Sequence, residues 1–383
     1  MKSQMWWENT MAVEVVTDYE SLRAREGEWR KLVQRSRLCN IFYEPEVLIP
    51  AIQFLTSQSS KVRIVLVKSA GELIGLFPVS RQPSWRGLPI SYMSLWKHPY
   101  QFLSTPLMDH LLYKYALEQF LGWLIKEVRY PRLFECSQLS AEFCEDGSGL
   151  AGVLNRLHLQ EALYYERRPA FFIDNYESFE QFWTNCSRAF RKKYRQRHRR
   201  LSESGAVLIE TLPQLTKAGT VEMLNSWIED FLILEESGWK GREGTAIRSH
   251  HKHLQFFVQT LHELFKRDKL HFMRLRVNEK TVAGKVTFTS GSRAFCFKIA
   301  YREEFSRCSP GLLLEIEFLR EVLRSRQFSV VDSCAIPNHP LFESIWEDSV
   351  GIASGMLYRG RVFGTLRALY CRTAGTSEHP RSL

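Results

Sequence analysis

Apolar and polar residues recur with two different periods along the chain, and these periods predict its helices and strands. Apolar residues spaced three and four apart indicate helices, whereas alternation or short apolar runs indicate strands. In the first half, helices are expected at 19–34, 47–55 and 112–128. Strands are expected at 12–16, on both sides of the turn Ser69-Ala70-Gly71-Glu72, at 90–96 and at 133–137.

The second half repeats this order of elements. Three strands are expected at 270–277, 281–290 and 293–301, followed by a helix at 312–325, a strand at 328–333, a small helix at 341–348 and a closing strand at 355–363. Three strands, a helix and a strand therefore occur twice, about 200 residues apart, with little identity between the copies. We predict an α/β protein with two copies of one fold, each a mixed, mostly antiparallel sheet flanked by helices.

Three helices are expected between the two copies. The first covers 179–203, because Ser178 and Gln181 have the spacing of a capping box and Gly205 follows as a stop signal. Its aromatic and apolar residues recur at steps of three, four or seven, which gives one apolar stripe. The other two helices are expected at 221–236 and 250–267.

The length and composition fit two globular domains. The chain has 383 residues, of which 44% are hydrophobic and 25% are charged, and a single core rarely serves so long a chain. We place a degenerate N-terminal domain at 1–168 and a C-terminal domain at 169–383. The net charge of +10 favours an anionic partner.

The eight cysteines show no metal-binding spacing. No two of them form a CxxC pair, and Cys136, Cys296 and Cys334 lie in apolar runs, where a thiol packs as a small hydrophobic group. No secretory signal and no apolar stretch of about 18 residues is visible. We therefore expect reduced thiols and a cytoplasmic protein, which can associate peripherally with the inner face of the membrane.

Motifs for metals and for common hydrolytic or nucleotide-binding chemistry are missing from the sequence. His250, His251 and His253 point in different directions on a helix and have no carboxylate at the spacing that a metal site needs. There is also no Walker loop, GxSxG elbow or HExxH helix. We expect no bound metal.

A phosphate-binding helix start is expected near residue 310. Pro310 and Gly311 directly precede an apolar helix, and Arg302 and Arg307 lie just before them. The first N–H groups of a helix lack internal partners and carry partial positive charge, glycine admits a ligand close to the backbone, and arginine can neutralise phosphate oxygens. The alternative is an ordinary helix start with solvated arginines, and spacing alone does not decide between the two.

This order of elements, with an arginine and a glycine in the loop before the helix, resembles the GNAT acyltransferase fold. In that family the loop and the helix start hold the pyrophosphate of acyl-coenzyme A, and this chain keeps Arg307 and Gly311 of the usual loop pattern. The resemblance implies acyl-CoA, either acetyl-CoA or a longer thioester, as the donor substrate. The residues that it implies for donor binding are Arg302, Arg307, Ser309, Gly311, Leu312, Leu313, Ile299 and Ala300.

Two segments and the basic helix are similar to a narrower family. The segment "AYREEFSRCSPGLLLEIEFLREVL" and the stretch "EESGWKGREGTAI" resemble the cellulose-biosynthesis-like acetyltransferases, which are tandem GNAT proteins related to the Fem peptidyltransferases. This resemblance implies that Trp239, Lys240 and Arg242 contact the substrate. The alternative is a connector between two helices with a buried tryptophan.

The strand ends beside the loop carry the candidate catalytic residues. Acyl transfer to an amine needs a base for the ammonium proton, a donor for the oxyanion and an acid for the leaving thiolate. Asp332, which ends an apolar strand, is the candidate base, with His339 as the fallback. Tyr301 could donate to the thiolate or the oxyanion, and Lys298 could hold a carboxylate or a phosphate. For Asp332, the alternative is a structural hydrogen bond in a cap or a loop.

The segment from Arg188 to Arg200 contains eight lysines and arginines and no acidic residue. Like charges four residues apart repel, so this helix needs burial of its apolar stripe or a bound anion. Suitable anions are the phosphates of acyl-CoA, an acidic membrane surface, a phosphorylated glycolipid and tRNA. Nucleic acid is the weaker choice because no base-reading module accompanies the charge. A solvated basic face is the remaining alternative.

We expect an acyl-CoA-dependent N-acyltransferase whose site lies at the splayed strand ends before Gly311. The expected acceptor is an amine, such as an amino sugar or a lipid-linked precursor of the cell envelope or of a polysaccharide. Two alternatives stay open. One is a Fem-like transferase that takes an aminoacyl group from tRNA, and the other is a non-catalytic, membrane-associated scaffold in polysaccharide synthesis.

Overall fold

The chain folds into two units, which are defined by their internal contacts. The computed structural model describes residues 11–56, 61–85, 87–127, 132–145, 149–214 and 217–359. Among these, unit 1 comprises residues up to 167 together with 350–359, and unit 2 comprises 168–349. The chain passes between the units within two strands, β7 (Gln160–Phe172) and β13 (Asp348–Arg359).

Unit 1 contains a sheet with the strand order β1-β2-β3-β4-β6-β13, and β5 pairs with β3. Its other strands are β1 (Met11–Val16), β2 (Val62–Ser69), β3 (Glu72–Gln82), β4 (Tyr92–Leu95), β5 (Leu107–Met108) and β6 (Arg132–Ser140). Neighbours in this order are antiparallel, except that β4 and β6 are parallel. The predicted turn between β2 and β3 is confirmed, since Ala70 and Gly71 adopt positive φ angles of 49° and 83°.

Helix α4 (Tyr113–Glu127) is the crossover between the parallel strands β4 and β6. Its Phe120 ring stacks on Phe77 of β3 with 4.1 Å between the ring centroids, and burial of these apolar surfaces stabilises the unit. The helix expected at 19–34 is two helices in the structure, because the backbone departs from helical geometry at Arg25 (φ −97°, ψ 5°). The other helices of unit 1 are α1 (Tyr19–Arg23), α2 (Glu26–Arg35), α3 (Pro45–Leu55), α5 (Ala141–Cys144) and α6 (Leu150–Arg156).

Unit 2 repeats the plan of unit 1. Its sheet has the order β7-β12-β11-β10-β9-β8, in which β11 and β12 are the parallel pair. The strands are β8 (Val207–Thr211), β9 (Leu270–Val277), β10 (Lys280–Ser290), β11 (Arg293–Tyr301) and β12 (Val330–Asp332). The three strands predicted at 270–301 are therefore confirmed to within one residue at their ends.

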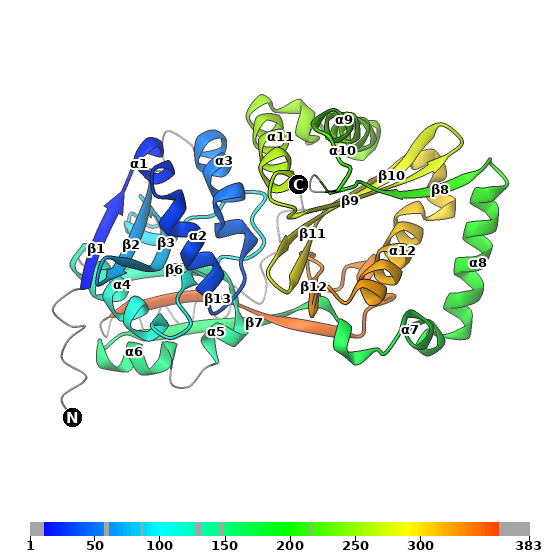
Figure 1. The fold of residues 1–383 in the computed structure, drawn as a ribbon. Coiled ribbons are helices and arrows are strands. Elements are labelled where there is room, and N and C mark those ends of the chain that lie inside the picture. Colours follow the sequence, from blue (N-terminus) through cyan, green and yellow to red (C-terminus); the bar gives the residue numbers. More distant parts are fainter. Residues whose placement is uncertain are drawn as a thin grey trace. The chain divides into compact units, whose positions relative to one another are not determined.

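Helices cover both faces of the unit 2 sheet (Figure 1). Helix α12 (Pro310–Ser325), the crossover between β11 and β12, lies on one face, and α9 (Val221–Ser237) and α11 (His251–Phe265) lie on the other. Phe297 of β11 stacks on Phe257 of α11, whereas the neighbouring Cys296 belongs to the cluster that packs under α12. The remaining helices are α7 (Phe179–Asn185), α8 (Arg188–Ser202), α10 (Trp239–Arg242) and α13 (Pro340–Glu343).

The segment expected to form one helix over 179–203 forms α7 and α8. Ser178 caps α7 by accepting a hydrogen bond from the Gln181 N–H at 3.2 Å, which confirms the predicted cap. Ser187 then caps α8 by accepting a bond from the Phe190 N–H at 3.1 Å. Because an N-cap residue has a non-helical backbone, the cap at Ser187 interrupts the helix.

The strand expected to close the C-terminal domain joins the sheet of unit 1 instead. β13 pairs antiparallel with β6, and Ile352 lies opposite Ser140. In unit 2, the end of β7 pairs antiparallel with β12, and Phe172 lies opposite Val330. Alternation of apolar residues marks a strand but does not name its neighbour, which is why the pairing differs from the expectation for 355–363. Residues 360–363 lie outside the described residues.

No helix within the described ranges combines the length and the apolar character that crossing a membrane would require.

Candidate functional site

Strands β11 and β12 lie side by side only at their beginning. Their parallel register ends at the pair formed by Phe295 and Asp332. Beyond it, in the described part of unit 2, residues 296–301 pair with β10 alone. β11 also bulges here, because its register with β10 shifts between Lys298, opposite Val286, and Cys296, opposite Thr287. A bulge bends its strand, and the result is an open strand edge beside α12.

The start of α12 lies against the end of this open edge. Ser309 precedes the helix with a left-handed backbone (φ 48°, ψ 58°). Its carbonyl oxygen accepts hydrogen bonds from the N–H groups of Leu312 at 3.0 Å and Leu313 at 3.2 Å. Pro310 has no N–H, so within the described structure Gly311 alone offers an N–H without an acceptor in this first turn. We expected several free amides near Leu312, and the structure leaves one.

The three arginines expected at the site have different surroundings. Arg302 is half-buried, and its Nε donates to the carbonyl oxygen of Thr281 at 2.9 Å. Arg242 forms a two-pronged ion pair with Glu303, at 2.8 and 3.0 Å, and this hydrogen bonding raises the pKa of Arg242. Arg307 is exposed. An anion at the start of α12 would therefore find Arg307 accessible.

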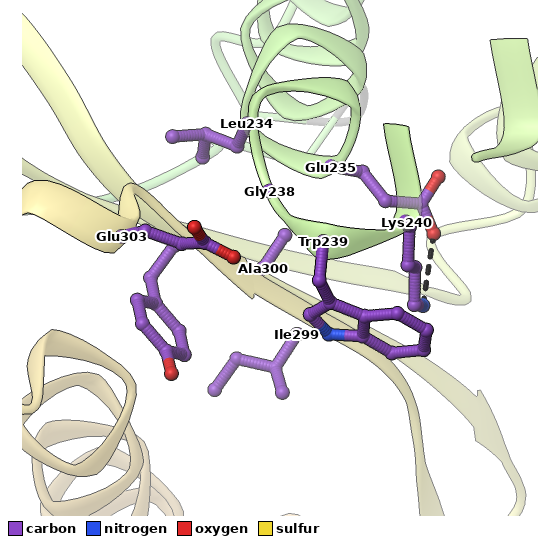
Figure 2. A pocket seen from close by; sticks show the side chains of 9 residues that line it. Leu234, Glu235, Gly238, Trp239, Lys240, Ile299, Ala300 and Glu303 are labelled. Carbon is purple, nitrogen blue, oxygen red and sulfur yellow. Dashed lines mark hydrogen bonds and ion pairs between the residues drawn. The ribbon is translucent and has the colours of Figure 1, made fainter. Parts of the chain in front are cut away.

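A pocket opens where the end of β11 meets the turn from α9 into α10 (Figure 2). Its lining consists of Leu234, Glu235, Gly238, Trp239, Lys240, Ile299, Ala300, Tyr301 and Glu303. Figure 2 shows the indole of Trp239 beside Ile299, and Lys240 reaching Glu235. Trp239 and Tyr301 are 41% and 42% exposed, so the pocket has accessible aromatic rings. A Cβ added to Gly311 would lie 3.4 Å from Ile299 and 3.7 Å from Tyr301, so the start of α12 adjoins this pocket.

A charged cluster borders the pocket. Oε1 of Glu235 accepts hydrogen bonds from Nζ of Lys240 at 3.1 Å and from Nζ of Lys298 at 3.4 Å. Oε2 accepts a bond from the N–H of Ile247 at 2.9 Å. The side chains of Glu235 and Lys298 are 4% and 10% exposed, respectively, so water screens these charges poorly.

The surroundings of Lys298 favour its neutral form. Burial and the positive charge of Lys240 lower the pKa of Lys298 to about 8, although the carboxylate of Glu235 opposes them. Burial would raise the pKa of Glu235, but Lys298 and Lys240 outweigh it and lower that pKa. A lysine that is half neutral near pH 8 can accept a proton under ordinary conditions.

Asp332 and His339 are not among the residues that line the pocket. Asp332 is 2% exposed, and its Oδ2 lies 3.4 Å from a guanidinium nitrogen of Arg168. Its Oδ1 accepts a hydrogen bond from the Cys334 N–H at 2.8 Å. His339 is the N-cap residue of α13, and burial lowers its pKa. Asp332 thus makes an internal ion pair at the point where β11 and β12 separate.

A second ion pair is buried under α12. Nζ of Lys285 on β10 lies 2.6 Å from Oε2 of Glu315 and 3.0 Å from Sγ of Cys296. Burial disfavours the charge on Lys285, but its neighbours, Glu315 among them, keep its pKa raised. Burial raises the pKa of Cys296 to about 12, so this thiol stays protonated at neutral pH. The cluster joins α12 to the two strands beside the pocket.

The structure brings part of the predicted site together. The predicted residues that line the pocket or border it are Trp239, Lys240, Lys298, Ile299, Ala300 and Tyr301. Glu235 and Lys285 were missed, although the sequence holds a signal for each. An acid in the last turn of a helix opposes the helix dipole, as Glu235 does. A lysine inside an apolar strand, as at position 285, needs a buried partner.

Within the described residues, no group of three or more histidine, cysteine, aspartate or glutamate side chains could hold a metal ion. The rings of His250 and His253 lie 5.0 Å apart. Seven cysteines are free thiols, with Cys136, Cys296 and Cys334 buried, and Cys371 lies outside the described residues.

The fold and part of the sequence are similar to known proteins. Residues 188–339 match the family model described as acetyltransferase (GNAT) domain. The crystal structure of FemX superposes with a TM-score of 0.55 and 11% identity, covering 92% of this chain and all of FemX. A conserved protein of unknown function from Bacteroides thetaiotaomicron superposes with a TM-score of 0.52 and 10% identity, over 86% of this chain and 97% of that one.

A third similar structure is the C-terminal domain of a protein from Agrobacterium fabrum, whose proposed activity is lysylphosphatidylglycerol synthesis. It has a TM-score of 0.51 and 11% identity, and covers 94% of this chain and 99% of that one. No curated protein matches the chain in sequence. Identities this low show the fold alone. The chain is therefore a mixed α/β protein, as predicted, in which two units repeat one plan, and residues 188–339 are similar to the GNAT acetyltransferase domain.

Proposed function

We propose that the chain transfers an acyl group from a coenzyme A thioester to an amine, at the open edge of β11 in unit 2. The observation that carries this proposal is the separation of β11 from β12 beside the start of α12, with a pocket on the last residues of β11. Free N–H and C=O groups on a strand edge can pair with the amides of a pantetheine arm. The phosphates of the donor would then lie toward the Gly311 N–H and Arg307.

Lys298 and Tyr301 can carry the proton transfers of this reaction. Neutral Lys298 takes one proton from the ammonium group of the acceptor and later releases it to water. The freed amine nitrogen attacks the thioester carbon, the new C–N bond forms, and the C–S bond breaks. The hydroxyl of Tyr301 gives a proton to the leaving sulfur and regains one from the amide nitrogen. Rate gains from such positioned groups are about 10²–10⁴-fold each.

Asp332 remains the competing proposal for the base. Its burial and its ion pair with Arg168 favour a structural role, since taking up a proton would remove the negative charge that faces the buried guanidinium. The variant Asp332→Asn tests the two proposals. We expect it to lower the unfolding temperature and to change kcat/KM of the folded protein less than tenfold. A loss of about 10²-fold or more in turnover at an unchanged unfolding temperature would return the base role to Asp332.

The proposed acceptor is an amine on a sugar or on a lipid-linked precursor of the cell envelope. Trp239 and Tyr301 present accessible rings of the kind that stack on sugar faces. The carboxylate of Glu303 lines the same pocket and can orient an ammonium group. The acyl chain that the pocket takes follows from the donor series described next.

Thermal unfolding with a series of donors tests the proposal. The series contains CoA, acetyl-CoA and longer acyl-CoA thioesters, with free adenosine diphosphate as the control for nonspecific phosphate binding. A donor present at 100 times its dissociation constant should stabilise the fold by about 2.7 kcal/mol, which gives a clear upward shift of the unfolding temperature. Unchanged unfolding temperatures across the thioester series would contradict the proposal.

Transfer from aminoacyl-tRNA is the second candidate function. Two observations favour it: the first turn of α12 offers a single free N–H in the described structure, and α8 presents a strongly basic surface. Lys192, Lys193 and Arg195 are exposed and have no acidic partner among the described residues. Gel-shift assays with charged tRNA test this candidate, and a charge reversal at these three positions should abolish the shift.

The same basic surface of α8 is proposed to contact the anionic inner face of a membrane if the acceptor is lipid-linked. Sedimentation with vesicles of phosphatidylglycerol and phosphatidylcholine measures this contact, with pure phosphatidylcholine vesicles as the control. Each lysine or arginine near an anionic surface contributes about 1 kcal/mol, so reversing three of them should release the protein. Binding to tRNA without binding to vesicles would favour the second candidate.

A further inference from the structure

Glu235 joins three elements of unit 2 at the pocket, and the transfer step proposed above leaves its role open. Its carboxylate accepts bonds from Lys240 of α10, from Lys298 of β11 and from the N–H of Ile247, which follows α10. Both carboxylate oxygens therefore have partners, and the group is nearly buried. Helix stability does not account for this residue, because an acid in the last turn of α9 opposes the helix dipole.

We propose that Glu235 is a positioning residue that fixes the amino group of Lys298 at the pocket and, opposed by Lys240, sets how readily Lys298 gives up its proton. The inference deepens the proposed acyl transfer and rests on it, since Lys298 is the group that exchanges protons with the acceptor. Glu235 acts through Lys298 and needs no contact with the reacting atoms.

The charged and titratable groups around Lys298 come from each helix on this face of the sheet. They are Glu235 of α9, Lys240 of α10, and His253 of α11, with His250 beside His253. Burial, His250 and Lys298 lower the pKa of His253, so its ring is neutral near pH 8 and contributes no charge there. Glu235 and Lys240 are left as the two fixed charges, and they act on the pKa of Lys298 in opposite directions.

Because the two charges act in opposite directions, removing one or the other should shift the titration midpoint of Lys298 in opposite directions. In Glu235→Gln, the negative charge is lost, so the charged form of Lys298 is less favoured and its titration midpoint should fall by about one pH unit. In Lys240→Met, the like charge is lost, so the midpoint should rise by about one unit. The double variant should return close to the starting value. A merely structural role predicts no such pair of opposite shifts.

The measurement need not depend on catalysis. The rate at which acetic anhydride modifies Lys298, followed by peptide mass spectrometry across pH 6–11, reports the midpoint directly, because only the neutral amine reacts. Glu236→Gln is the matched control: Glu236 is the next residue on α9 but pairs with Arg248 at 3.4 Å. We expect this control to leave the midpoint of Lys298 and the activity unchanged.

Activity provides the second readout. With a donor that supports transfer, kcat/KM rises with pH. This rise should occur at lower pH in Glu235→Gln and at higher pH in Lys240→Met. Midpoints that do not move, or that move in the same direction in both variants, would overturn the positioning role even if transfer occurs. Opposite shifts of the midpoint without any transfer would uphold the positioning role and reject the acyl transfer. If Glu235→Gln does not fold, Lys240→Met alone decides by the sign of its shift.

Discussion

The two crossover helices, α4 in unit 1 and α12 in unit 2, follow the same strand order but begin in different ways. Just before α4, Oδ1 of Asp109 accepts bonds from the N–H groups of Leu111 and Leu112 at 2.9 and 3.2 Å. A carboxylate of the protein thus holds the turn that leads into α4. Before α12, Ser309 makes no side-chain cap, and the Gly311 N–H is left open. One topology therefore supports a helix entered through a turn that Asp109 holds in unit 1, and a helix whose first turn keeps an open N–H in unit 2.

The side chains packed between each crossover helix and its sheet also differ, including aromatic rings under α4 and charged groups under α12. Under α4, the rings of Phe77 and Phe120 stack. Under α12, Lys285 and Glu315 form a buried ion pair. Removing charges from water is unfavourable unless their partners are well placed, so the buried pair under α12 demands a more exact geometry than the stacked rings under α4 do.

The largest expected effect is on activity, from the variant Lys298→Met. Loss of the base should lower kcat/KM by about 10²–10⁴-fold while the fold is kept. Lys97→Met in unit 1 is the matched control, because Lys97 is the third residue after the last parallel pair of β4, as Lys298 is in β11. Steady-state kinetics across pH should also show the wild-type rate rising through about pH 8, since the pKa of Lys298 is about 8 and its neutral form is the base. Equal losses in both variants would remove the distinction between the units.

The next effect is on stability, from the variant Lys285→Met. The change leaves Glu315 buried without its counter-ion and should lower the free energy of unfolding of unit 2 by about 3–5 kcal/mol. The double variant Lys285→Met with Glu315→Leu should recover most of this loss, because two apolar groups then face each other. Calorimetry resolves the transition, and Lys280→Met on the exposed end of the same strand should change stability by less than about 1 kcal/mol. A double variant as unstable as the single one would show that the pair is needed for more than charge balance.

The smallest effect is expected in unit 1. Asp109→Ala removes two hydrogen bonds in the turn before α4 and the ion pair with Arg35. It should lower the free energy of unfolding by about 1–2 kcal/mol, without a change in kcat/KM. The same calorimetric and kinetic measurements check it. If this variant instead gained affinity for a nucleoside diphosphate, unit 1 would be a masked anion site rather than a degenerate one.

The sequence could predict the elements but not all of their neighbours. The strands at 270–277, 281–290 and 293–301 and the cap at Ser178 follow from periodicity and capping chemistry, which are local. The pairing of β13 with β6 is a long-range choice, and alternation alone does not encode it. The break at Ser187 also had a local signal, since serine is a favoured N-cap residue. We missed it because the apolar stripe continues across the break.

The candidate site was predictable only in part, because local motifs mark some of its residues and contacts between distant segments determine the others. Ile299 to Tyr301 and Trp239 to Lys240 come from two segments whose motifs point to function, and the structure places both segments at one pocket. The burial of Asp332 depends on Arg168, which is distant in sequence, so no local pattern reports it. The role of Glu235 likewise depends on Lys298 of another element.

The central claim is that unit 2, and not unit 1, holds the acyl donor at the open edge of β11. Hydrogen exchange with and without acetyl-CoA, read by mass spectrometry, tests it most directly because backbone amides report a ligand at peptide resolution. We predict slower exchange in the presence of acetyl-CoA at residues 296–301 and at the start of α12, with residues 92–112 of unit 1 unchanged. Protection confined to unit 1, or none at saturating acetyl-CoA, would contradict the account.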